Sequence, residues 1–240
     1  MSPKTVKNSL FLVFLALCAA SCTQKQVVVS GSFPEPLVEP LKIEVGVIYP
    51  SDFKNHEIYD EAKTRSDSDW VVKTGEAQVE FWTGFLSAFF EKAVFIDNEE
   101  TLVEESADLE AILIPSVAQL EYSVPNQSNV NIYEIWMRYS FQLMPTDAVQ
   151  IDASGEVSFD PSESIATWYL TAYGKTPTAL LQSSEEAVNL AAIVALRDAG
   201  AHFVTTFTHV PGIEGWLKQL GGLPPSGTLE VPQNHEQDGL

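Results

Sequence analysis

Hydrophobic residues recur with two different periods along the chain, and these periods predict strands and helices in a definite order. Alternation is clearest over 133–143, where every second residue is apolar. Because successive side chains of a strand point to opposite faces of a sheet, this stretch predicts a long strand with one buried face. The same pattern predicts strands over 42–49 and 165–173, a strand region over 109–124 and a short strand over 94–96.

Two other stretches have the three- and four-residue spacing of amphipathic helices. Over 76–91 the apolar positions form an aromatic stripe, which we expect to pack in the core. Over 185–207 the apolar face consists of small residues that can lie close against a sheet, and Ser183 with Glu186 predicts a capping box at its start. The stripe contains Val79, Trp82, Phe85, Leu86, Phe89 and Phe90, and the small-residue face contains Ala187, Leu190, Ala191, Val194 and Ala201.

This order of elements predicts an α+β two-layer sandwich, a mainly antiparallel sheet with two helices packed on one face. We expect residues 42–223 to form one domain, in which the polar stretch 51–73 is a long loop. Pro115 lacks a backbone N–H, so it predicts a bulge or an edge position in its strand. The proline-containing stretch 22–41 is expected to be a flexible tether, and 224–240 a disordered tail.

The amino terminus has the order of charges and apolar residues of a secretory signal. Lys4 and Lys7 precede the apolar run Leu10–Leu17, which is too short to span a bilayer as a permanent helix. Small residues then lead into Cys22. This resembles the lipobox of bacterial lipoproteins, in which the cysteine is acylated on sulfur and becomes the mature amino terminus, although Ala19 stands where that family usually has Leu, Val or Ile. We therefore predict a signal peptide over 1–21 and lipidation of Cys22.

An ordinary secretory signal, cleaved after Ala20 or Ser21, is the alternative. The resemblance to lipoproteins implies sorting to the periplasmic face of the outer membrane of a Gram-negative cell, because Thr23 and not Asp follows the cysteine. A second or third acyl chain makes such anchoring durable. Both cysteines, Cys18 and Cys22, lie in this stretch, so the mature chain contains no internal disulfide.

Charge excludes two classes of partner. The formal net charge of −20 becomes −22 when the signal leaves, because Lys4 and Lys7 are removed and no acid is. Nucleic acids and anionic membrane surfaces both require clustered Lys and Arg, so neither is expected to bind. The acidic residues are scattered in pairs without the spacing of a calcium loop, which is typical of a solvated surface.

Motifs of catalysis are missing from the sequence. There is no Gly-x-Ser-x-Gly elbow, no phosphate-binding glycine loop and no His-Glu-x-x-His. His202 and His209 are seven residues apart and could share a helix face, but a zinc site needs further ligands. We therefore expect no catalytic site, no metal and no cofactor; a cleft that gathered the two histidines with two acids would revive an enzyme hypothesis.

Two groups of residues are candidates for binding a partner. Trp136 and Arg138 share the polar face of the strand over 133–143, and Trp168 lies on the strand expected beside it. Exposed aromatic residues with arginine are typical of binding hot spots. The alternative is that a loop or the tether covers these side chains. The second group, over 210–217, is expected to pack back on the core.

The order of elements is similar to that of bacterial envelope lipoproteins, the group that includes the curli-secretion lipoprotein and the auxiliary lipoproteins of ABC-type transport. The matching stretches are 42–50, 75–90, 107–122 and 133–144, together with the alanine-rich last helix. The resemblance implies a non-enzymatic role in building pores, tethering machinery or supporting transport. No pair of long amphipathic strands rich in Gly and Ser matches the pore-forming hairpins of the curli family.

Two hypotheses follow. The first is a lipid-anchored periplasmic accessory protein that binds other envelope or transport components through a sheet edge or through the Trp136 and Arg138 face. The second is a carrier or binding module for a small apolar ligand, such as a lipid, held between the sheet and the aromatic helix. A cavity behind Trp82, Phe85 and Phe89 would favour the second hypothesis, and close packing there would oppose it.

Overall fold

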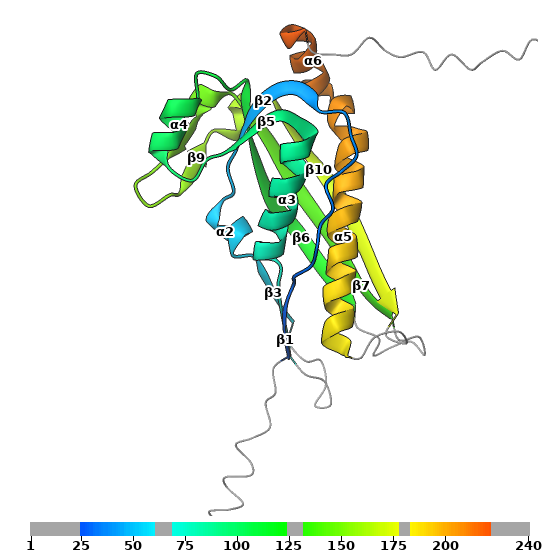
Figure 1. Cartoon of the computed structure of the whole chain (residues 1–240). Coiled ribbons are helices and arrows are strands. Elements are labelled where there is room, and N and C mark those ends of the chain that lie inside the picture. The colour runs from blue at the N-terminus through cyan, green and yellow to red at the C-terminus, as the bar shows by residue number, and fades with distance from the viewer. Residues whose placement is uncertain (1–24, 61–68, 124–131, 178–182, 222–240) are drawn as a thin grey trace, which may run out of the picture.

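A five-stranded sheet forms the centre of the protein (Figure 1). The computed structural model of the chain describes residues 25–60, 69–123, 132–177 and 183–221. The sheet has the order β10–β7–β6–β2–β5, with β10, β7 and β6 antiparallel and β2 parallel to both β6 and β5. The predicted α+β class is confirmed, with a mixed sheet. Its strands are β2 (Leu41–Val47), β5 (Phe90–Phe95), β6 (Ala111–Ser123), β7 (Ile132–Met144) and β10 (Ala166–Pro177).

Two helices, α3 (Gly75–Phe89) and α5 (Ser184–Thr206), cover one face of this sheet, as predicted (Figure 1). Trp82 of α3 is fully buried between them. Its ring meets Tyr139 and Phe141 of β7 at 5.6 and 5.1 Å, and Phe203 of α5 at 5.5 Å, in edge-to-face contacts. Such aromatic pairs add to the free energy of burying the rings. The aromatic stripe is therefore core, and the sheet and both helices fill the space around it.

The close approach of α5 to the sheet depends on small residues. Ala187, Ala191, Ala195 and Ala199 are all completely buried. The predicted face is therefore correct at Ala187 and Ala191 only, because Leu190 and Val194 are half-buried and Ala201 is exposed. Opposite them, Gly174 of β10 lies so near α5 that a Cβ there would overlap the backbone oxygen of Ala191. Ser183 caps the helix as predicted, because its side chain accepts the N–H of Glu186 at 3.1 Å, which is one half of the expected capping box.

By length and hydropathy, the stretch Ser184–His209 could cross a membrane, and it is the one such helix among the described residues. More than half of its apolar window, 56%, is buried inside the protein. Packing against β10 and β7 thus accounts for its apolar character.

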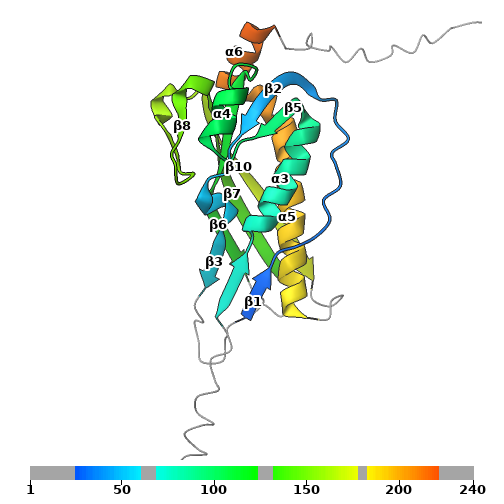
Figure 2. The ribbon, with the colours of Figure 1, turned by 60° about the vertical axis from the view of Figure 1, so that its left-hand side comes forward.

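The other face of the sheet is covered at one end by α4 (Glu99–Glu105) and by a small hairpin of β8 (Val149–Ile151) and β9 (Val157–Phe159) (Figure 2). Ile112, Ile114 and Met144 point to this side and form a second, smaller core with the hairpin and α4. The turn residues 152–155 therefore close this hairpin; they do not join β7 to β10 directly.

Residues expected to be a tether and a loop instead form a second sheet. β1 (Lys25–Val28) pairs parallel with β4 (Trp70–Lys73), which pairs antiparallel with β3 (Glu57–Asp60). Val27 and Val29 are buried, so the tether expected over 22–41 is wrong over 25–33 and at Leu41, where β2 begins. The long loop expected over 51–73 is also wrong, because it contains α2 (Ser51–Lys54), β3 and β4. In both stretches the apolar residues lie in short runs among polar ones, and tertiary contacts bury only some of them; Val28, Leu37 and Tyr59 stay exposed.

At Pro115, strand β6 is no longer paired with β2. The pairing of β6 with β2 ends at Leu113, so the missing N–H of Pro115 breaks no bond on that side. The bulge comes later, between Val117 and Gln119, and it exchanges the faces to which the following side chains point. Ile114 therefore lies on the face opposite the helices, whereas Leu120 packs under them.

The segment after α5 packs on the core, as expected. It forms α6 (Pro211–Leu220), in which Ile213 and Leu217 are completely buried and Trp216 is 8% exposed. Gly221 ends this helix with a left-handed backbone, φ 73°, which glycine adopts without strain. The predicted signal peptide, Cys22 and the whole of the expected tail over 224–240 lie outside the described residues.

We predict that Gly174→Ala lowers the free energy of unfolding by about 2–3 kcal/mol, because the added methyl group pushes the α5 backbone away from β10. Urea unfolding followed by tryptophan fluorescence measures this. Gly84→Ala in α3 is the matched control, since a Cβ there meets nothing within 4 Å; it should raise the free energy of unfolding by up to ~1 kcal/mol. Equal midpoints for the two variants would contradict the close helix–sheet contact.

Candidate functional site

The uncovered part of the sheet, on the side away from α3 and α5, contains two of the residues that the sequence singled out. β7 alternates strictly, so Tyr139 and Phe141 are buried beneath the helices while Trp136 and Arg138 point to the other side. Trp136 is 37% exposed and Arg138 is exposed. We call this surface the open face: the outward side chains of β7 and β10 from Trp136 to Arg138 and from Tyr169 to Tyr173.

Tyr173 of β10 lies beside Trp136, with ring centroids 5.3 Å apart. Its hydroxyl donates a hydrogen bond of 2.5 Å to the carboxylate of Glu134. Because ionisation of the tyrosine would lose this bond, Glu134 raises the pKa of Tyr173. The bond also restricts the Tyr173 ring, which in turn supports one side of the Trp136 indole.

Arg138 lies over the ring of Tyr169, with its guanidinium carbon 4.4 Å from the ring centroid. Tyr169 is 58% exposed. Within the described part of the chain, no carboxylate forms an ion pair with Arg138, so its guanidinium donors face solvent. A guanidinium held flat on a ring keeps its in-plane N–H groups free for an acceptor on another molecule.

A shallow hollow of about 310 Å³ lies between these residues and β6. The bulge in β6 turns Gln119 and Glu121 toward the open face, where Gln119 is paired in register with Arg138. The Gln119 amide donates to Glu121 at 2.6 Å. The hollow therefore has an aromatic wall at Trp136, a cation at Arg138 and a carboxylate at Glu121.

Trp168 does not belong to this face, so its predicted place beside Trp136 and Arg138 is wrong. It is paired in register with Phe141, stacks on that ring at 5.2 Å and is only 7% exposed. Residues paired in register point to the same side of a sheet, and Phe141 points to the core. Tyr169 and Tyr173 are the outward residues of β10, and the side to which they point follows only from the register between β10 and β7, which the pattern of one strand does not contain.

The outer edge of β10 is occupied by side chains of α5. Asp198 accepts the backbone N–H of Tyr173 at 2.9 Å, and Nδ1 of His202 donates to the carbonyl oxygen of Thr171 at 2.7 Å. These contacts block strand addition at the middle of this edge. His202 therefore has a structural partner, and no group of three His, Cys, Asp or Glu residues suited to a metal occurs among the described residues.

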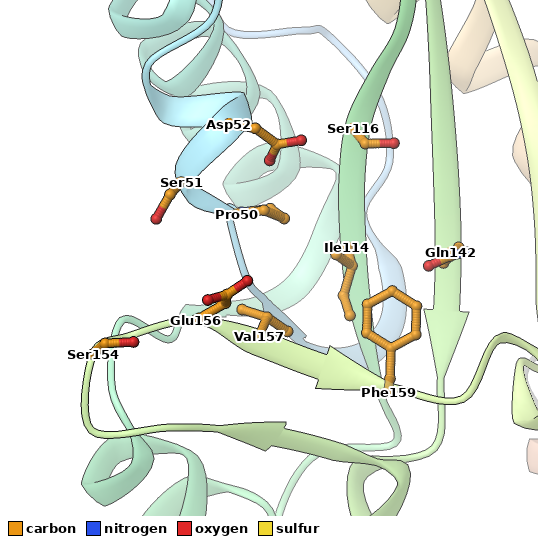
Figure 3. Close-up of a pocket in the computed structure, with 10 residues that line it drawn as sticks. All are labelled: Pro50, Ser51, Asp52, Ile114, Ser116, Gln142, Ser154, Glu156, Val157 and Phe159. Carbon is orange, nitrogen blue, oxygen red and sulfur yellow. The ribbon is translucent and has the colours of Figure 1, made fainter.

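A larger hollow, of about 700 Å³, lies further along the same side of the sheet (Figure 3). Its apolar floor is made by Ile114, Val157 and Phe159, and the carboxylates of Asp52 from α2 and Glu156 from the hairpin stand at its rim. None of the ten lining residues is basic. Such a rim can hold a positively charged group whose aliphatic part lies on the floor.

A rigid turn positions Glu156 at this hollow. The Asp152 carboxylate accepts the N–H groups of Ser154 and Glu156 at 2.8 and 3.0 Å, and Gly155 supplies the positive φ of 81° that the turn needs. Hydrogen bonds from the Ser154 hydroxyl and from the Glu156 and Ser154 amides lower the pKa of Asp152. These bonds form to the ionised carboxylate, so the turn is most stable when Asp152 is charged.

No protein-family model and no curated protein matches this chain. Among solved structures, it is similar to a Xanthomonas campestris protein of the family model DUF330, with 12% identity and a TM-score of 0.43 over 82% of this chain and 99% of that one. A minor lipoprotein from Acinetobacter baumannii has 10% identity and a TM-score of 0.37 over 72% of this chain and 97% of that one.

A Helicobacter pylori homolog of neuraminyllactose-binding hemagglutinin has 10% identity and a TM-score of 0.43, over 82% of this chain and 100% of that one. Because all three TM-scores lie below 0.5, these likenesses carry no argument about the activity of this chain.

We predict that Asp152→Asn destabilises the protein at neutral pH, and that the difference from the parent vanishes in acid. The folded pKa of Asp152 lies below its ordinary value of 3.8, so its contribution is present above that value and is lost as the pH falls through the folded pKa. Thermal unfolding at pH values from 7 down to 2.5 measures the difference. Asp147→Asn, at an exposed site outside the turn, is the charge-matched control. A difference that persists unchanged in acid would contradict the assignment.

Proposed function

We propose that this protein is a lipid-anchored, non-enzymatic accessory protein of the bacterial envelope, which binds another envelope component through its open face. The observation that carries the proposal is the pair of exposed ring contacts, Trp136 with Tyr173 and Arg138 with Tyr169. Both pairs are held in place before any partner arrives, so little side-chain entropy is lost on binding. Preorganised Trp, Tyr and Arg are the residues that contribute most to protein interfaces.

At the β10 side of the sheet, the occupied middle of the strand edge favours binding through the open face over addition of a partner strand to β10. Asp198 and His202 occupy the outer backbone groups of β10, whereas the face beside that edge remains uncovered by described residues. The two acids at the larger hollow would complement a basic partner residue reaching along the same side of the sheet. A partner that lies across β7 would contact both regions, because Gln142 and Arg138 are four residues apart, about 13 Å along the strand.

The alternative of a carrier for a small apolar ligand finds no favourable observation among the described residues. The ligand would have to lie between the sheet and α3, where Trp82 contacts five aromatic rings at 5.1–5.6 Å. Both hollows described above lie on the other side of the sheet and have polar rims.

The proposed address is the periplasmic face of the outer membrane, and it rests on the lipobox-like sequence that ends at Cys22. We predict that Cys22→Ala abolishes incorporation of radiolabelled palmitate and releases the protein from the membrane fraction, since the thiol is the acylation site. Cys18→Ala is the matched control and should leave both unchanged. A Cys22→Ala protein that stays in the membrane and carries label would contradict the anchor.

Partner binding is tested with a photo-crosslinking amino acid placed at Trp136 of the full chain in its own cells. We expect one discrete adduct, which is identified by mass spectrometry and is absent when Val103, a 68% exposed residue of α4, carries the crosslinker. With that partner purified, Trp136→Ala should weaken binding by about 2 kcal/mol, roughly 30-fold. Equal crosslinking from both positions would contradict a binding site on the open face.

A further inference from the structure

The chain is fixed to the fold almost as soon as it leaves the predicted lipidation site. β1 begins at Lys25, which pairs with Trp70 of β4, and its backbone N–H donates to Asp69 at 2.7 Å. The Lys25 ammonium donates to Ser184 at 2.8 Å and forms an ion pair with Glu185 at 3.5 Å. These contacts hold the first described residue against both β4 and the amino end of α5.

The contacts continue along the next eight residues, so the segment 25–33 is a docked strap. Ser30 exchanges two hydrogen bonds with the side chain of Asn189, at 2.9 and 3.0 Å, and Arg197 donates to the carbonyl of Ser32 at 2.8 Å. A Cβ on Gly31 would overlap the Ile193 side chain, which shows how closely the strap lies on α5. Phe33 then packs edge-on against Phe81 at 5.3 Å. Figure 1 shows this strap running along α5 from β1 toward β2.

The remaining length of free chain is therefore very short. Only Thr23 and Gln24 separate Cys22 from Lys25. Three residue steps reach at most about 11 Å even when fully extended. The headgroup layer of one leaflet is itself about 5–7 Å thick, so an acyl chain on Cys22 would bring Lys25 to the membrane surface.

We propose that the end of the fold formed by β1, the β3–β4 hairpin and the start of α5 rests on the lipid headgroups of the membrane that holds the anchor. This inference rests on the proposed lipidation of Cys22. The protein then stands with α4, α6 and the β8–β9 hairpin pointing away from the bilayer, because these elements lie at the opposite end of the molecule (Figures 1 and 2).

The side chains at this end suit a largely zwitterionic lipid surface. Lys25 pairs with Glu185, and Lys73 pairs with Glu57 at 3.7 Å, so these charges cancel within the protein. Tyr59 of β3 is 55% exposed there, and tyrosine is enriched at the headgroup level of membranes because its ring is apolar and its hydroxyl is polar. An acidic protein is not attracted by anionic lipid, so the short chain, and not charge, sets the orientation.

The test uses the full-length lipidated protein in vesicles of phosphatidylethanolamine that contain a headgroup-linked nitroxide quencher. Single cysteines at Tyr59, Val103 and Tyr169 receive a fluorophore; they are the only free thiols after processing, since Cys18 leaves with the signal and Cys22 is acylated. We expect quenching severalfold stronger at position 59 than at 103, with position 169 between them. Equal quenching at 59 and 103, or the strongest quenching at 169, would overturn the orientation.

A second variant tests whether the short chain between Cys22 and Lys25 is what causes the strong quenching at position 59. Twelve Gly and Ser residues inserted between Gln24 and Lys25 give a flexible span of about 20 Å and leave the strap and the anchor intact. We expect the quenching at position 59 to fall to the level at 103. Unchanged quenching would overturn the short-chain argument. If the parent protein fails to bind vesicles, the proposed lipidation of Cys22 is wrong. If it binds but quenching is equal at all three positions, the lipidation stands and only the proposed orientation is wrong.

Discussion

The contact between small residues of α5 and β10 is the constraint on which the rest of the structure depends. Four alanines of the helix and Gly174 of the strand let the two backbones approach closely enough for their peptide groups to come into contact. Because α5 packs so close to the sheet, the Phe203 ring contacts Trp82 of α3 and Phe141 of β7, and these contacts complete the aromatic core. The same helix supplies Asp198 and His202 to the edge of β10 and Asn189 and Arg197 to the strap. A bulkier face on α5 would disturb all of these contacts together.

The sequence predicted those elements whose hydrophobic pattern is long and regular. The alternation over 133–143 gave β7, the aromatic stripe gave α3, and the small-residue face gave α5 with its capping serine. These patterns are visible because each element buries one face along its whole length. The short strands β1, β3 and β4 escaped prediction, since each has only four residues and owes its burial to a distant neighbour. The bulge in β6 escaped as well, because an extra residue in one strand is defined only by its partner.

Part of the candidate site could be predicted from the sequence, and the same distinction between local pattern and pairing partner decides which part. Trp136 and Arg138 were placed correctly because they lie on one strand, whose alternation fixes the side to which each points. Trp168 was misplaced because its side depends on the register between β10 and β7, which neither strand encodes alone. Its absence from the open face changes the chemistry there: two tyrosine hydroxyl groups replace an indole, so the surface offers more polar contacts than the sequence had suggested.

The parallel pairing of β1 with β4 has a mechanical consequence. If Cys22 carries the proposed lipid, a force that draws the protein away from the membrane is applied at the amino end of β1 and so loads the pair of strands along their length. Backbone hydrogen bonds between parallel strands are evenly spaced along the pair. They would therefore share the load in shear and give way together, whereas a strand pulled sideways would lose them singly. The proposed anchor would therefore load β1 in its more resistant direction, and the lifetime of the attachment would be set by the rate at which β1 detaches.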